Sequence, residues 1–137
     1  MFGAGNTLLI QMSKAFIIDD DPIHQRIAQI MIAKHQLFDE FTSYLHAGEA
    51  LKFLEENFNV TEALPDVILL DLNMPVVDGW KFLDEFEKFK DTLIKKIRIF
   101  IVSSSVDEKD ISRSKSYASV EGFISKPLSA EMIKKSL

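Results

Sequence analysis

The chain has 137 residues, of which 47% are hydrophobic and 27% charged, so it is long enough to form one domain with a substantial core. Its net charge of −5 argues against a general nucleic-acid binder, and the lack of cysteine excludes disulfides, thiolate metal sites and cysteine nucleophiles. No apolar run is long enough to span a membrane, and the first residues lack the basic head of a signal peptide, so we expect a cytoplasmic protein without membrane insertion.

From residue 14 onward, short β-rich apolar runs alternate with longer amphipathic stretches. Strands are predicted at 15–18, 41–44, 67–70, 97–102 and 122–125. Helices are predicted from about Pro22, over 47–58, over 80–90, from a cap at Asp107 through Ile111, and over 130–137. This alternation predicts an α/β fold of five strands and five helices, with a parallel sheet covered on both faces. We expect one domain over residues 14–137, preceded by an N-terminal extension, residues 1–13, to which we assign no role.

Three of the predicted helices carry apolar side chains at helical spacing. In the first helix these apolar side chains share one face. In the second helix we expect them to point inward, and in the third we expect them in the core rather than in a cofactor site. In chain order these sets are Ile23, Ile27, Ile30 and Met31; Ala50, Leu51, Leu54 and Phe58; and Phe82, Leu83, Phe86 and Phe89.

Carboxylates follow two of the predicted strands. Asp19, Asp20 and Asp21 close the first strand, and Asp71 closes the strand at 67–70. The carboxyl ends of parallel strands open onto one edge of the sheet, so we expect Asp19, Asp20 and Asp71 to converge. Such a cluster either protonates one member or binds a cation, and carboxylate oxygens suit Mg²⁺. Asp21, directly before a proline, is expected to cap the first helix.

Two more polar residues follow strands at the same edge, Ser103 after the fourth and Lys126 after the fifth. Together these groups suit the transfer of a phosphoryl group to a carboxylate, in which Asp71 is the nucleophile. Mg²⁺ on Asp20 and Asp71, with Asp19 acting through water, would neutralise charge on the phosphoryl group. The Lys126 ammonium would contact a second phosphoryl oxygen, and the Ser103 hydroxyl would donate to the third.

With these residues the chain resembles the receiver domains of two-component response regulators, most closely the single-domain, chemotaxis-type members. Four ordered motifs carry the resemblance, which extends from residue 14 to the C-terminus. They are residues 17–22 (IIDDDP), residues 69–75 (LLDLNMP) with Asp78-Gly79, residues 101–104 (IVSS), and Lys126-Pro127.

The resemblance implies a flavodoxin-like, doubly wound sheet in strand order 2-1-3-4-5. It also implies that Asp71 is phosphorylated by a sensor histidine kinase, a histidine phosphotransfer protein or a small phosphodonor, with Mg²⁺ as cofactor. Asp19 and Asp20 would be the acidic pair, and the backbone carbonyl of Asn73 would complete the metal shell.

In the same way, the resemblance implies that Lys126 binds the phosphoryl group and that its bond to Pro127 is cis. Ser103 takes the place of the switch hydroxyl, and Phe123 that of the switch aromatic residue. Gly79 fits the tight turn before the third helix.

These residues together predict a phosphorelay switch rather than an enzyme. Phosphorylation would reshape the surface of the fourth helix, fifth strand and fifth helix, which then contacts a protein target that the sequence does not identify. The protein would be a monomer or a phosphorylation-dependent dimer. One alternative is a receiver-like interaction module that works without phosphorylation. A less favoured one is a Mg²⁺-dependent aspartyl phosphohydrolase, for which Asp19 and Asp21 have the usual spacing of nucleophile and general acid.

Two further residues, His24 and Trp80, are expected near the site. His24 is interpreted as a solvated helix residue in preference to part of a kinase-docking face. Trp80, which begins the third helix, is a candidate fluorescence reporter of metal or phosphate binding.

Overall fold

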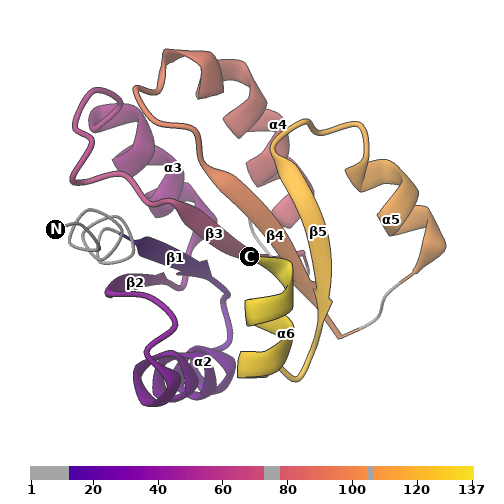
Figure 1. Cartoon of the computed structure of the whole chain (residues 1–137). Helices are drawn as coiled ribbons and strands as arrows, with labels where there is room; N and C mark the ends of the chain where they lie inside the picture. The colour runs from indigo at the N-terminus through magenta and orange to yellow at the C-terminus, as the bar shows by residue number, and fades with distance from the viewer. Residues whose placement is uncertain (1–12, 73–77, 105–106) are drawn as a thin grey trace, which may run out of the picture.

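The computed structural model describes residues 13–72, 78–104 and 107–137 (Figure 1). The strands are β1 (Lys14–Ile18), β2 (Glu40–Tyr44), β3 (Val67–Asp71), β4 (Arg98–Ser103) and β5 (Val120–Ser125). The helices are α2 (Pro22–His35), α3 (Ala47–Glu56), α4 (Gly79–Phe89), α5 (Glu108–Ser114) and α6 (Ala130–Ser136), with a short 3₁₀ turn, η1 (Lys90–Thr92), after α4. Each predicted strand and helix is present.

The five strands form one sheet in the order β2-β1-β3-β4-β5, and every neighbouring pair is parallel. This confirms the expected doubly wound, flavodoxin-like architecture and its strand order. Because all strands run the same way, their carboxyl ends lie along one edge of the sheet. That edge is where the candidate site is found.

Two apolar cores cover the two faces of the sheet. Phe16 and Ile18 of β1 point into the core shared with α3 and α4, whereas Ala15 and Ile17 point into the core shared with α2 and α6. Figure 1 accordingly shows α2 and α6 together on one side of the sheet. Burial of alternate residues on opposite faces explains why the strands are continuous apolar runs rather than alternating ones.

Helix α2 packs with a different face from the one that Ile23, Ile27 and Ile30 mark. Ile23, Ile27 and Ile30 do share a face, but they are 70%, 49% and 54% exposed. The buried residues of α2 are Gln25, Ala28 and Ile32. The small side chain of Ala28 lets the helix lie close to the sheet, and Gln25 bonds to the ends of two strands, as described below.

Helix α3 ends earlier than predicted. Ala50, Leu51 and Leu54 are buried as expected, but Phe58 lies beyond the last helical residue and is 43% exposed, so its predicted inward position is wrong. In α4 the prediction holds for Phe82, Leu83 and Phe86, which are buried, while Phe89 is partly buried against the same core.

Side-chain caps define where two helices begin. The carboxylate of Asp21 accepts from the backbone N–H of Ile23 at 2.8 Å, and this hydrogen bond is the main cause that lowers the pKa of Asp21. The carboxylate of Asp107 accepts from the N–H of Lys109 at 2.9 Å. Both predicted capping roles are confirmed. Within the described ranges, none of the helices is long and apolar enough to cross a membrane.

Candidate functional site at the carboxyl edge of the sheet

The register of the sheet brings the polar strand ends to one place. Asp71 at the end of β3 lies opposite Val102, so that Ser103, the next residue of β4, extends just past it. Ser103 in turn lies opposite Ser125, so that Lys126 is the first residue beyond β5. Asp19 follows β1, the other neighbour of β3. Four strands therefore supply side chains to one site.

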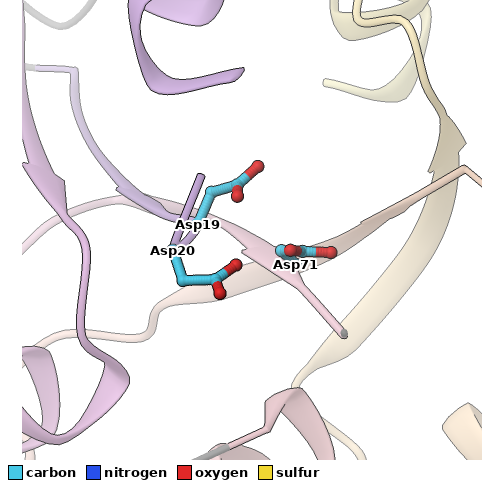
Figure 2. Close-up of side chains that lie close together, drawn as sticks. All are labelled: Asp19, Asp20 and Asp71. Carbon is cyan, nitrogen blue, oxygen red and sulfur yellow. The ribbon is translucent and has the colours of Figure 1, made fainter. Parts of the chain in front are cut away.

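Asp19, Asp20 and Asp71 form a compact acidic cluster. One carboxylate oxygen of each lies within 4.8 Å of the others, and Figure 2 shows the three groups facing a common space. Asp19 and Asp71 are 6% and 5% exposed, and Asp20 is half-buried. Three oxygen donors at this spacing, with one side open to solvent, fit a hard divalent cation that retains waters. Asn73, expected to add its backbone carbonyl, lies outside the described residues.

The backbone around Asp19 is held by contacts from α2 and β2. Its carboxylate Oδ1 accepts from the N–H of Asp21 at 2.9 Å, and its own N–H donates to the carbonyl of Tyr44 at 3.1 Å. The Nε2 group of Gln25 donates to the carbonyls of Ile17, Asp19 and Tyr44 at 3.0, 3.0 and 2.8 Å. The sequence motifs did not predict a role for Gln25. The sequence feature that could have marked Gln25 is its place as a polar residue on the same face of α2 as Ala28.

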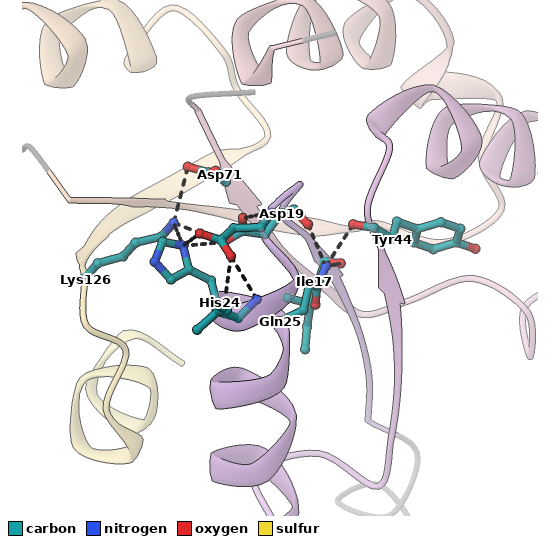
Figure 3. A network of polar contacts seen from close by, with 9 residues as sticks. Ile17, Asp19, His24, Gln25, Tyr44, Asp71 and Lys126 are labelled. Atoms are coloured by element: carbon teal, nitrogen blue, oxygen red, sulfur yellow. Dashed lines mark hydrogen bonds and ion pairs between the residues drawn. The ribbon is translucent and has the colours of Figure 1, made fainter. Parts of the chain in front are cut away.

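Lys126 lies between two of the carboxylates. Its Nζ is 3.0 Å from Asp19 Oδ2 and 3.6 Å from Asp71 Oδ1 (Figure 3). Its backbone N–H donates to the carbonyl of Ser103 at 2.9 Å, and its bond to Pro127 is cis, as the family resemblance implied. The ammonium offsets part of the charge that the carboxylates concentrate at this edge.

His24 contacts this group, although its sequence position favoured a solvated role. Its Nδ1 is 3.0 Å from Lys126 Nζ, 3.6 Å from Asp19 Oδ2 and 3.5 Å from Asp21 Oδ2, while its side chain is 44% exposed. Figure 3 shows the ring beside the ammonium. The contact joins residues 102 positions apart, so local sequence spacing could not predict it.

The two expected switch residues occupy different environments. Ser103 is 1% exposed at the end of β4, next to Asp71 in the sheet. Phe123 is only partly buried and packs against the core that contains α3 and α4. Ser103 therefore lies at the site, and Phe123 lies on the neighbouring strand β5, opposite Ile101.

Gly79 sets how closely α4 approaches Asp71. A Cβ atom at this position would lie 2.7 Å from the Asp71 carbonyl oxygen and 2.7 Å from the Cα of Leu72. The Gly79 N–H donates to the Leu72 carbonyl at 3.0 Å. Gly79 was expected in the tight turn before this helix, but it is the first residue of α4, and close backbone contact rather than an unusual backbone angle calls for glycine there.

A pocket of about 330 Å³ opens beside the cluster. Asp19, Asp71, Lys126 and His24 line its polar side, and its apolar side comes from α2, from β1, β3 and β4, and from the segment after Lys126. Ile27, one of the exposed isoleucines of α2, also lines it. Asp71 is therefore reachable from solvent through a mixed polar and apolar opening.

A five-stranded parallel sheet with three carboxylates and a lysine at its carboxyl edge defines the class of α/β receiver domains. The sequence model of the response regulator receiver domain matches residues 15–137. The chain belongs to this family, and it is a receiver domain of two-component signalling.

The similar proteins agree with this assignment. The chain is 27% identical over 124 residues to the probable C4-dicarboxylate response regulator DctR of Bacillus subtilis, covering 90% of this chain and 50% of DctR. It is 34% identical over 89 residues to the sensor histidine kinase CheAY of Helicobacter pylori, covering 65% of this chain and 11% of CheAY. The chain thus spans half the length of DctR and a small part of CheAY. Among solved structures, a two component response regulator from Cytophaga hutchinsonii superimposes with a TM-score of 0.82 at 27% identity, covering 90% of this chain and 92% of that one.

Proposed function

We propose that this receiver accepts a phosphoryl group on Asp71. The observation that carries the proposal is the convergence of the carboxylates of Asp19, Asp20 and Asp71 within 4.8 Å, with the Lys126 ammonium 3.6 Å from Asp71. A carboxylate flanked by a cation site and an ammonium suits the transfer of a group that carries negative charge on three oxygens.

In the transfer, an oxygen of Asp71 attacks the phosphorus atom and forms an acyl phosphate. The bond from phosphorus to the donor atom breaks, and the leaving group keeps the electron pair. The donor atom is a histidine nitrogen in a protein donor and an oxygen in a small acyl phosphate. Lys126 then contacts one phosphoryl oxygen as a point charge, and the Ser103 hydroxyl donates to another.

Asp19, Asp20 and Asp71 would hold Mg²⁺, and the backbone carbonyl of Asn73 would add a ligand. When bound, the ion supplies charge neutralisation at the phosphoryl oxygens. The buried position of Asp19 and Asp71 favours this role, because the three carboxylates carry more negative charge than the single ammonium of Lys126 offsets.

The phosphoryl donor is proposed to be a sensor histidine kinase or a histidine phosphotransfer protein. Such a donor reaches Asp71 through the pocket that His24 and Ile27 line.

The response is proposed to begin when Ser103 moves toward the phosphoryl group and Phe123 turns inward, which changes the surface of α5, β5 and α6. A protein target reads that surface, with the receiver as a monomer or as a phosphorylation-dependent dimer. We propose no enzymatic role beyond the receiver's own phosphorylation and dephosphorylation.

The two alternatives receive less support from the geometry. In a phosphohydrolase using Asp19 as nucleophile, Asp21 would be the general acid, yet its carboxylate caps α2 and Asp19 is paired with Lys126 at 3.0 Å. A receiver-like module that works without phosphorylation does not require the assembled cluster of three carboxylates and a lysine.

The direct test is incubation with acetyl phosphate and Mg²⁺, followed by intact mass measurement. We expect a mass gain of one phosphoryl group that depends on Mg²⁺ and is absent in Asp71→Asn. A wild-type protein that gains no mass while it binds no Mg²⁺ would instead support the phosphorylation-independent module. Sustained turnover of an added phosphoester would support the phosphohydrolase.

A further inference from the structure

The ammonium of Lys126 has three N–H donors and, within the described part of the chain, three close polar neighbours. Two are carboxylate oxygens, Asp19 Oδ2 at 3.0 Å and Asp71 Oδ1 at 3.6 Å, and the third is Nδ1 of His24 at 3.0 Å. The carboxylates belong to the proposed metal and phosphoryl site. His24 is the neighbour of Lys126 that has no assigned part in the chemistry.

We propose that His24 is a positioning residue for Lys126. Its Nδ1 accepts one N–H of the ammonium and keeps the ammonium beside Asp71, where a phosphoryl oxygen would meet it. This inference deepens the proposed function and depends on it. It assigns His24 a role in the rate of phosphoryl transfer that is separate from any contact with a protein donor.

The hydrogen-bond chemistry specifies the form of the ring. An ammonium group can only donate, so the proposed contact requires that Nδ1 offers a lone pair and that the ring proton is on Nε2. An asparagine at this position places its Oδ1 near where Nδ1 lies and can accept the same N–H. A leucine has a similar size but offers no acceptor.

The backbone of His24 is well placed to hold the ring. The residue lies in the first turn of α2, which Asp21 caps and which Ala28 and Ile32 anchor to the core. The side chain of His24 is itself 44% exposed and is not among the core residues. Replacing it therefore changes the polar contact without disturbing the packing of α2.

The test measures the rate of phosphorylation by acetyl phosphate with Mg²⁺, because a small donor needs no protein docking. The variants are His24→Leu and His24→Asn, each made alone and with Lys126→Met. His35→Leu is the matched control, because His35 is an exposed histidine at the far end of the same helix.

We expect His24→Leu to slow phosphorylation about three- to tenfold, as loss of a partly exposed hydrogen bond to a charged group should. His24→Asn should recover most of that loss, and His35→Leu should react like the wild type. With Lys126→Met present, His24→Leu should cause no further slowing. An equal effect of leucine and asparagine, or an undiminished effect in the Lys126→Met protein, would contradict the proposal.

A second readout needs neither metal nor phosphoryl donor. In ¹⁵N NMR spectra of the metal-free protein, His24 should show the Nε2–H tautomer, with a coupling from Lys126 Nζ to Nδ1 that disappears in Lys126→Met. If the wild type takes no phosphoryl group, the proposed function fails, and this coupling alone shows whether the His24–Lys126 contact exists. If the wild type is phosphorylated but the coupling is absent and His24→Leu reacts normally, only the positioning role fails.

Discussion

Gln25 connects α2 to two strands through a single amide group. Its Nε2 donates to the carbonyls of Ile17 and Asp19 at the end of β1 and of Tyr44 at the end of β2. The side chain is 4% exposed, so water cannot easily replace these contacts. The amide thereby fixes the backbone that places the Asp19 carboxylate in the acidic cluster.

Replacement of Gln25 by leucine should lower the free energy of unfolding by about 1–3 kcal/mol, because three carbonyls lose the buried amide donor. It should also weaken Mg²⁺ binding, since Asp19 loses part of its support. Gln29→Leu is the matched control, because among the described residues the Gln29 amide on the same helix bonds only to the Ser43 hydroxyl, at 2.9 Å. Urea unfolding and a Mg²⁺ titration followed by Trp80 fluorescence measure the two effects. Equal losses from the two substitutions would contradict the specific role of Gln25.

At the scale of elements, an aromatic cluster links α4 to α5 and the segment that follows it. The ring of Trp80 stacks on Tyr117 with centroids 5.9 Å apart, and the Arg113 guanidinium lies 4.3 Å from the Trp80 ring centre. The Tyr117 hydroxyl donates to Asp84 Oδ1 at 2.6 Å. Because α5 belongs to the surface proposed to respond to phosphorylation, Trp80 is placed to report movement of α5 as well as events at Asp71.

Burial raises the pKa of Tyr117, and the carboxylate of Asp84 raises it further. The hydroxyl therefore stays protonated and donates to Asp84. A raised pKa in the folded state contributes stability below the ordinary tyrosine value of about 10, and this stability is lost as the pH rises through the folded-state pKa.

We expect Tyr117→Phe and Asp84→Ala each to lower the free energy of unfolding by about 1 kcal/mol at neutral pH. The double variant should lose little more than either single variant, because both changes remove the same hydrogen bond. Tyr117→Phe should also lose less stability than the wild type between neutral and strongly alkaline pH. Urea unfolding at two pH values measures the losses in the single variants, the loss in the double variant and the pH dependence. Fully additive losses in the double variant would show that the two residues act independently.

The strands and helices also show what could be predicted from the sequence and what could not. The strands and the convergence of Asp19, Asp71, Ser103 and Lys126 could be predicted, because parallel strands have a fixed direction and their ends share an edge. The buried face of α2 could not be predicted from apolar spacing alone. The exposed isoleucines are spaced as one helical face, and the buried Ala28 and Ile32 are spaced as another. Which of the two faces is buried depends on how the helix fits against the sheet. Local spacing likewise cannot reveal a contact such as that between His24 and Lys126, which exists only once the segment after β5 lies beside α2.

For the whole molecule, the fold brings together residues from four strand ends, and the two cores hold that arrangement fixed. The acidic cluster is near one edge of a rigid sheet, whereas α5 and the partly buried Phe123 lie on the side proposed to change. In the proposed function, phosphorylation takes place at the acidic cluster, and the surface that is proposed to take two arrangements lies elsewhere on the molecule.

Asp71 is proposed to be the residue that carries the phosphoryl group. Reduction of the phosphorylated protein with borohydride converts an acyl phosphate to the alcohol, so that tandem mass spectrometry can locate the modified residue. We predict homoserine at position 71 alone, dependent on acetyl phosphate and Mg²⁺. Reduction at Asp19 or Asp20, or an unmodified Asp71 in protein that has gained a phosphoryl group, would contradict the claim.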